Sequence, residues 1–168
     1  SIPEGSIIVD HTTASAKITK ELYNYCKSSK NVSFIDAPVS GGQAGAENGQ
    51  LTIMVGGDEP AYLKIEPLLK SYAKNSTLIG DSGSGQLAKM VNQICIAGLL
   101  QGLSEAINFG QKVNLDMEKV IGVIKDGAAS SWQMQNRHQT MAKNEFDFGF
   151  AVEWMRKDLK ICLEQADK

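Results

Sequence analysis

The stretch GSGQLAKMVNQ, residues 83–93, decides the fold because the character of the sequence changes where it occurs. Gly83, Gly85 and Ala88 have the G-x-G-x-x-A spacing of a dinucleotide-binding loop, and the stretch follows a strand-like run and opens a helical one. In that kind of loop a crossover helix returns the chain to the same sheet. Here the helical pattern continues from residue 86 to about residue 111, and no strand pattern follows. We therefore interpret the glycines as a flexible, close-packed junction between two domains.

Strand and helix patterns alternate before this junction. A helix is expected to begin at Asp58 with Pro60 in its first turn, and Pro67 is expected to break or kink it before residues 68–73. The alternation predicts an α/β layer arrangement. The other predicted elements are strands over 6–10, 32–36, 51–55 and 77–80 and a helix over 12–27.

The pattern after the junction is entirely helical. Its long first helix is apolar nearly all round between residues 94 and 103, which predicts that this helix is buried. Small residues recur along it every four positions and form a seam that would let another helix approach closely: Gly98, Gly102, Ala106 and Gly110. The predicted helices are 86–111, 116–125, 130–143 and 151–166.

The predicted sheet is incomplete. Four strands with about two covering helices leave the apolar strand at residues 7–9 without a partner on one side, and a bare apolar edge promotes aggregation. The chain is therefore interpreted as the last part of a doubly wound α/β domain, residues 1–82, followed by most of a helical domain, residues 83–168. The boundary is placed at Asp81–Gly85.

Composition excludes several classes of protein. The chain has 168 residues, 42% of them hydrophobic, which is typical of a globular protein with a core. A net charge of −2 argues against a nucleic-acid surface, and the longest apolar run, 94–100, is too short to span a bilayer. Cys26, Cys95 and Cys162 are widely spaced and two histidines form no ligand cluster, so we expect reduced thiols, a cytosol-like compartment and no metal.

Lys89 is the first candidate for chemistry. It lies one turn into the long helix, and Asn92 and Gln93 project from nearly the same face at i+3 and i+4. One interpretation is a lysine whose stem covers apolar surface beside solvated amides. The other is an amine between the domains that exchanges a proton with a substrate oxygen, because burial lowers the pKa of a lysine toward neutrality.

A second candidate is the glycine-rich stretch at residues 36–46. It follows the carboxyl end of a strand, where open α/β sheets bind ligands. Ser40 offers a hydroxyl, and Gly41 and Gly42 expose backbone N–H groups that suit an anion such as a carboxylate. The alternative is a turn without a ligand. The G-x-S-x-G spacing of a nucleophilic serine is absent.

Four segments together carry a resemblance to a known family: VDHTTAS (9–15), FIDAPVSGGQAGAENGQLTIMVGG (34–57), GSGQLAKMVNQ (83–93) and WMRKDL (154–159). In this order and spacing they resemble the β-hydroxyacid dehydrogenases, which include 3-hydroxyisobutyrate dehydrogenase and tartronate semialdehyde reductase and are related to 6-phosphogluconate dehydrogenase. The resemblance implies a Rossmann-like domain joined by a long interdomain helix to a helical domain of the 6-phosphogluconate dehydrogenase type.

The resemblance also implies roles for single residues. Lys89 would be the general acid in reduction and the general base in oxidation. Ser40, Gly41 and Gly42 would hold the substrate carboxylate, and Asn92, with Gln93, would fix the substrate oxygen.

The implied cofactor is NAD or NADP, with Thr13 on its nicotinamide side and Lys157 near cofactor and substrate. His11 replaces a small polar residue at its position and is interpreted as structural. The family's own G-x-G-x-x-G lies in an N-terminal βαβ unit outside this sequence, so these 168 residues are expected to turn over weakly or not at all. A homo-oligomer formed through the helical domain is also expected, in the cytoplasm or in the mitochondrial matrix of a eukaryote.

The implied substrate is a small 3-hydroxy acid or its semialdehyde. Lys-x-x-Asn-Gln resembles the tartronate semialdehyde reductases, whereas the hydroxyisobutyrate enzymes more often carry Asn-Asn and the 6-phosphogluconate enzymes His-Asn. A phosphosugar substrate would need basic residues, for which Arg137 and His138 are the single candidate cluster. The competing hypothesis is a non-catalytic oligomerisation or recognition domain on the same scaffold.

Overall fold

A computed structural model describes residues 2–167 of the chain, apart from the side chains of residues 29 and 30. The chain folds into two compact units. The first extends to Gln93 and resumes at Gly149, and the second is Ile94–Phe148. These units are defined by contacts within this chain, and they do not test the predicted boundary between two domains at residues 82 and 83. That boundary stays a prediction.

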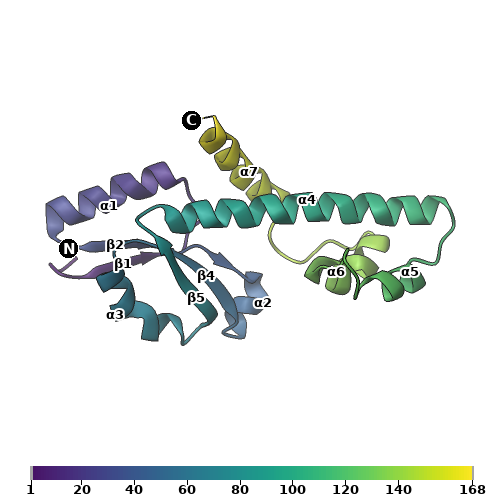
Figure 1. The fold of residues 1–168 in the computed structure, drawn as a ribbon, viewed down its shortest axis with the longest axis horizontal. Coiled ribbons are helices and arrows are strands. Elements are labelled where there is room, and N and C mark those ends of the chain that lie inside the picture. The colour runs from purple at the N-terminus through teal and green to yellow at the C-terminus, as the bar shows by residue number, and fades with distance from the viewer. Residues whose placement is uncertain (1, 168) are drawn as a thin grey trace. The chain divides into compact units, whose positions relative to one another are not determined.

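The first unit contains a mixed sheet (Figure 1). β1 pairs in parallel with β2, and β4 pairs in parallel with β5 but antiparallel with β2 and β3. β2 and β3 follow one register along β4, with Asp36 opposite Gly56 and Val39 opposite Ile53. Among the described strands β1 pairs with β2 alone, so the predicted open edge is confirmed. The strands are β1 Ile7–Asp10, β2 Ser33–Asp36, β3 Val39–Ser40, β4 Leu51–Gly56 and β5 Ala73–Gly80.

Helices cover both faces of this sheet. Side chains alternate along β2, so Phe34 packs in the cluster under α1, Ala16–Lys30, while Ile35 packs in the cluster under α3, Glu59–Leu69. Figure 1 shows the two helices on opposite sides of the strands. The predicted α/β layers are therefore confirmed.

Two local predictions differ from the structure. Pro67 lies inside α3, which ends at Leu69, and β5 begins at Ala73, so residues 68–73 do not form a further helical piece. A proline near the carboxyl end removes one backbone hydrogen bond where the helix is about to stop, which makes it tolerable there. The glycine-rich stretch also contains structure that the sequence did not predict, the short strand β3 and the helix α2, Gly42–Glu47.

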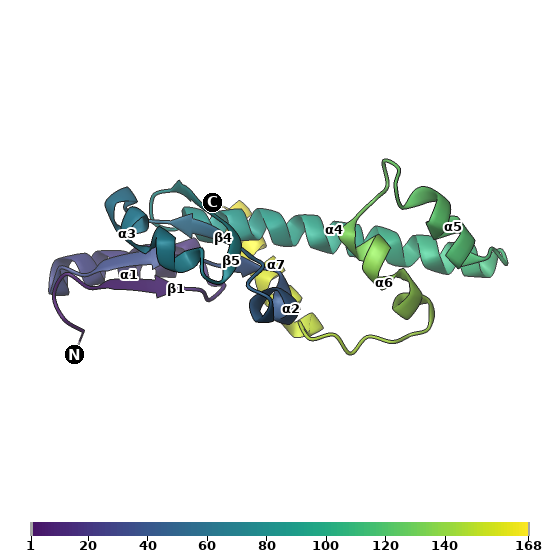
Figure 2. The ribbon, with the colours of Figure 1, turned by 90° about the horizontal axis from the view of Figure 1, so that it is seen from below.

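The second unit is entirely helical, as predicted. It contains the later part of α4, Ser84–Lys112, together with α5, Met117–Ile124, and α6, Trp132–Ala142. Its core consists of Leu103, Ile107, Ile121 and Met134. Figures 1 and 2 both show α5 and α6 beside this part of α4. The last helix, α7, Val152–Ala166, belongs to the first unit.

The prediction that α4 is buried all round is wrong for this chain. Ile94 is 54% exposed and Phe109 is 64% exposed. Within the second unit, α5 and α6 cover one side of α4, and a Cβ at Gly110 would collide with the side chain of Met117. Apolar residues all round a helix indicate that other surfaces cover it, but not that the same chain supplies them. Among residues 2–167 there is no helix that is long and apolar enough to cross a membrane.

Candidate active site

The start of α4 is built around Asp36, whose side chain is fully buried at the end of β2. Its two carboxylate oxygens accept hydrogen bonds from the backbone N–H groups of Gly83 and Gln86, at 2.8 and 3.1 Å. A Cβ at Gly85 would lie 2.5 Å from the carbonyl oxygen of Met54. A remote carboxylate thus caps the helix, and the glycines allow close packing. The predicted close packing of these glycines is confirmed, whereas their place at a flexible junction between two domains stays a prediction. The N–H groups bound to Asp36 are not free to hold a pyrophosphate.

Lys89 lies one turn further along α4 and is 6% exposed. Its Nζ donates a 2.8 Å hydrogen bond to the carbonyl oxygen of Val39, the residue before Ser40. Burial lowers the pKa of Lys89, the carboxylate of Asp158 opposes this effect, and the ammonium group of Lys157 adds to it. The structure therefore places a partly dry amine next to the Ser40–Gly42 bend.

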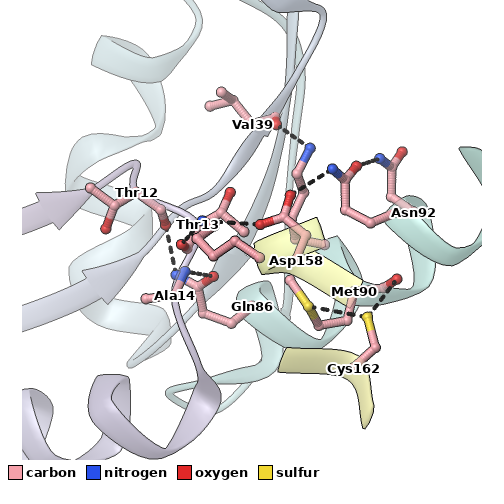
Figure 3. Close-up of polar contacts among 12 residues, drawn as sticks. Thr12, Thr13, Ala14, Val39, Gln86, Met90, Asn92, Asp158 and Cys162 are labelled. Carbon is pink, nitrogen blue, oxygen red and sulfur yellow. Dashed lines mark hydrogen bonds and ion pairs between the residues drawn. The ribbon is translucent and has the colours of Figure 1, made fainter. Parts of the chain in front are cut away.

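The other predicted polar residues form a connected chain of contacts across α4 and α7 (Figure 3). Asn92 Nδ2 donates to Gln93 Oε1 at 2.8 Å, and Gln93 Nε2 donates to Asp158 Oδ2 at 2.7 Å. The other oxygen of Asp158 lies 3.0 Å from Lys157 Nζ, which donates to the carbonyl oxygen of Thr13 at 2.7 Å. Two residues predicted near the cofactor, Thr13 and Lys157, thus touch each other.

Ser40 closes β3, and the two glycines after it turn the chain into α2. Gly41 has φ +130° and Gly42 has φ +61°, which are conformations that residues with a Cβ rarely adopt. Both glycines are exposed and Ser40 is half-buried. The bend therefore presents its backbone and one hydroxyl to the surface beside Val39, where the amine of Lys89 is bound.

His11 binds two partners in the sheet region. Its Nδ1 donates to the carbonyl oxygen of Ala37 at 2.6 Å, and its Nε2 lies 2.9 Å from the hydroxyl of Tyr72. Because a carbonyl accepts and does not donate, Nδ1 carries a proton. Burial raises the pKa of Tyr72.

Arg137 and His138, the basic pair considered for binding a phosphosugar, both contact other residues of the second unit. The guanidinium group of Arg137 stacks on the rings of Phe148 and Trp132, at 4.2 and 5.1 Å from their centroids. His138 is largely buried, and its Nδ1 donates to the carbonyl oxygen of Met134 at 2.7 Å. These contacts do not favour a phosphate site.

The sequence did not single out Asp158 and Gln86. Asp158 is 1% exposed and Gln86 fully buried, although residues of these types usually face water. From the sequence alone, an aspartate next to a lysine on an amphipathic helix is interpreted as a solvated charge. The spacing of residues within α7 does not indicate that Asp158 faces α4.

The fold and two family models together define a class of protein. An α/β sheet is followed by helices, and both parts of the chain match models of nicotinamide-dependent dehydrogenases. Residues 83–168 match the family model described as NAD-binding of NADP-dependent 3-hydroxyisobutyrate dehydrogenase. Residues 1–80 match the NAD-binding domain of 6-phosphogluconate dehydrogenase. The chain belongs to the β-hydroxyacid dehydrogenase family, whose cofactor is NAD or NADP.

Individual relatives agree with this assignment. An uncharacterized oxidoreductase of Shewanella frigidimarina is 55% identical over 96% of this chain and 55% of its own length. The 2-hydroxy-3-oxopropionate reductase of Escherichia coli is 37% identical over 97% of this chain and 56% of its own length. The solved structure of Psf3 in complex with NADP+ and 2-OPP is 26% identical, with a TM-score of 0.89 over 98% of this chain and 57% of that one. The chain thus spans little more than half the length of these relatives.

Proposed function

We propose that the protein is an NAD(P)-dependent oxidoreductase that interconverts a small 3-hydroxy acid and its semialdehyde, with Lys89 as general acid and base. The observation that carries this proposal is the position of Lys89 Nζ, 2.8 Å from Val39 O, and 6% exposure of the residue. Val39 is followed directly by the bend at Ser40–Gly42, whose backbone N–H groups suit an anion.

Lys89 supplies the proton chemistry in this proposal. In reduction, its ammonium group gives a proton to the substrate carbonyl oxygen, and in oxidation its neutral amine takes the proton of the hydroxyl group. A lysine of ordinary pKa is a poor base at neutral pH, so the lowering by burial favours both directions. The bond to Val39 holds the amine beside the bend while it is not engaged with substrate.

The substrate contacts divide between exposed and buried groups. Ser40 and the backbone N–H groups of Gly41 and Gly42 hold the carboxylate. The amide of Asn92 is half-buried and orients the reacting oxygen. Gln93 is 1% exposed, and both ends of its amide are hydrogen-bonded. We therefore propose that Gln93 orients the side chains of Asn92 and Asp158 and does not contact the substrate directly.

The residues of this chain fit the nicotinamide end of the cofactor. Thr13 and Lys157, which the family resemblance assigns to that end, are in contact at 2.7 Å. When bound, the cofactor would deliver or accept the hydride. The N–H groups at the start of α4 are occupied by Asp36, so the loop for the pyrophosphate is expected outside this chain.

The test of this proposal is Lys89→Met in the protein at full length, assayed with a panel of small semialdehydes and 3-hydroxy acids and with both cofactors. A general acid–base contributes about a hundredfold to ten-thousandfold to the rate, so kcat should fall by that amount. Lys160→Met is the control, because Lys160 lies on α7 with a 78% exposed side chain. A wild-type protein that assembles but reduces none of the panel would favour the non-catalytic recognition domain.

We further propose that the protein forms a homo-oligomer through the helices. The support is the exposed apolar surface of α4, where Val91 is 63% and Ile94 is 54% exposed. Light scattering of the full-length protein and of Ile94→Glu checks this. A wild-type monomer would refute it without affecting the proposal for Lys89.

A further inference from the structure

The segment around Thr13 is held on both sides by one side chain. Gln86, fully buried on α4, accepts a 3.0 Å hydrogen bond at Oε1 from the backbone N–H of Ala14. Its Nε2 donates a 2.9 Å hydrogen bond to the carbonyl oxygen of Thr12. The two bonds join the main chain immediately before and immediately after Thr13 (Figure 3).

This contact needs a carboxamide. Among side chains of this length in their usual ionisation state at neutral pH, glutamine alone carries a donor and an acceptor on the same terminal group. It can pair with one N–H and one C=O as another peptide group would. Methionine would fill the same space without either bond, and glutamate would keep the acceptor but lose the donor. Residues 12–14 lie between β1 and α1 and have no regular secondary structure to satisfy these groups.

Other contacts also hold residues 12–14 in place, in addition to the two hydrogen bonds of Gln86, which are called the clamp below. The carboxylate of Asp10 accepts hydrogen bonds from the backbone N–H and the hydroxyl of Thr12. Lys157 binds the carbonyl oxygen of Thr13 itself. The Lys157 side chain is 41% exposed, whereas Gln86 is fully buried, so the bonds of Gln86 are the ones shielded from water.

We propose that Gln86 is a positioning residue that fixes the main chain on both sides of Thr13 and so sets the place of Thr13 at the nicotinamide end of the cofactor. The inference rests on the proposed function, which assigns Thr13 to that end. Gln86 precedes Lys89 by three residues on the same helix, so α4 orients the proton donor and the cofactor segment together.

The test uses Gln86→Met in the full-length protein, with two readouts that do not depend on turnover. The first is hydrogen–deuterium exchange of a peptide spanning residues 11–17, which reports the Ala14 amide. The second is the Kd for NADH and NADPH. Loss of two neutral hydrogen bonds should accelerate exchange and raise the Kd by about tenfold to thirtyfold. The pH profile of kcat should keep its midpoint, because Gln86 carries no charge.

Gln135→Met is the matched control. The Nε2 of Gln135 also ties a loop, by donating to the Lys125 carbonyl oxygen and the Ser130 hydroxyl, but it does so in the second unit. It should change neither readout. Gln86→Glu is the second variant: it has the same shape and regains the donor when protonated, so its cofactor binding should strengthen as the pH falls.

The outcomes separate the two proposals. Unchanged exchange, or faster exchange with unchanged Kd, in Gln86→Met overturns the positioning role while the proposed function stands. A wild-type protein that binds neither reduced cofactor overturns the proposed function. If Gln86→Met does not fold, Gln86→Glu decides, and cofactor binding by that variant that equals wild type at all pH values overturns the clamp.

Discussion

Lys157 and Asp158 are neighbours on α7 and act on the pKa of Lys89 in opposite directions. The ammonium group of Lys157 lowers it, and the carboxylate of Asp158 raises it. The two side chains lie 3.0 Å apart, so each also limits the effect of the other. Burial is the largest of the three effects and outweighs the carboxylate of Asp158, so the pKa of Lys89 is lowered.

If the proposed function holds, substitution of either neighbour should therefore move the pH profile of the oxidation rate along the pH axis. Asp158→Asn removes the carboxylate that raises the pKa of Lys89, so the rise of the oxidation rate with pH should occur at lower pH. Lys157→Met removes a positive charge and should move the same rise to higher pH. The measurement is kcat for oxidation between pH 5 and about pH 10.5 for each variant in the full-length protein.

The opposite signs make this prediction specific. Asparagine keeps an oxygen that can accept the hydrogen bond from Gln93, so Asp158→Asn tests charge more than geometry. Lys160→Met again serves as the control on α7. Shifts of both profiles in the same direction would contradict the electrostatic account.

The lowered pKa of Lys89 should also appear in the stability of the protein. The unfolded chain keeps the ordinary lysine pKa of 10.5, and the folded value is lower, so between the two values the unfolded state binds more protons. The free energy of unfolding must then rise with pH across that window. Lys89→Met lacks this dependence. The signed difference in unfolding free energy, Lys89→Met minus wild type, should therefore become less positive or more negative as the pH rises toward 10.5.

Urea denaturation at several pH values checks this, because the midpoint of each curve follows the free energy of unfolding. The Met variant also loses the hydrogen bond to Val39. This loss contributes to the difference in unfolding free energy for a reason other than the titration of Lys89. The test is thus the slope of the difference against pH and not its sign at one pH. Parallel curves for the two proteins would show that Lys89 titrates in the folded state as it does in the unfolded state.

The order of the elements, apart from β3 and α2, and the place of Lys89 near the start of α4 were predictable from the sequence. The strand and helix patterns depend on local periodicity, and the glycine positions at the start of α4 fix where the pattern changes. The neighbourhood of Lys89 and Ser40 followed from the family resemblance, and the bond of Lys89 to Val39 agrees with it.

The remaining features depend on contacts between distant segments. Asp158 meets Gln93 from 65 residues away, and Gln86 reaches Thr12 and Ala14 across 74 and 72 residues. Neither pairing leaves a mark in local spacing. The exposure of Ile94 was unpredictable for a different reason, since its apolar neighbours indicate burial without showing which chain provides it.

Gly85 should tolerate no side chain. A Cβ there would lie 2.5 Å from the Met54 carbonyl oxygen and 2.8 Å from Asp36 atoms, and two of the three contacts are to backbone that cannot rotate away. Overpacking of this kind costs about 1–3 kcal/mol, and we expect Gly85→Ala to fall at the upper end. Gly122→Ala is the control. Gly122 lies within α5 with open space around it, so alanine should stabilise the helix by about 0.5–1 kcal/mol. Equal unfolding free energies for the two variants would refute the packing argument.

Asp36 should matter for stability through its two hydrogen bonds to the start of α4. Each carboxylate oxygen serves one backbone N–H, of Gly83 and of Gln86. Asparagine offers one oxygen and one NH2 group, so Asp36→Asn loses one bond and turns a donor toward a donor. Leaving a buried N–H unsatisfied costs about 1–3 kcal/mol, and loss of the negative charge at the helix start adds to this.

Asp81→Asn separates these two causes. Asp81 also lies near the start of α4, but its side chain is exposed, and the hydrogen bond that it contributes comes from its backbone carbonyl, which accepts from Ser84. Its loss of charge should change the free energy of unfolding by less than about 0.5 kcal/mol, because surface substitutions of this kind rarely do more. Urea denaturation of both variants gives the comparison. If Asp81→Asn destabilises as much as Asp36→Asn, then the charge near the helix end, and not the buried pair of hydrogen bonds, stabilises the junction that places Lys89.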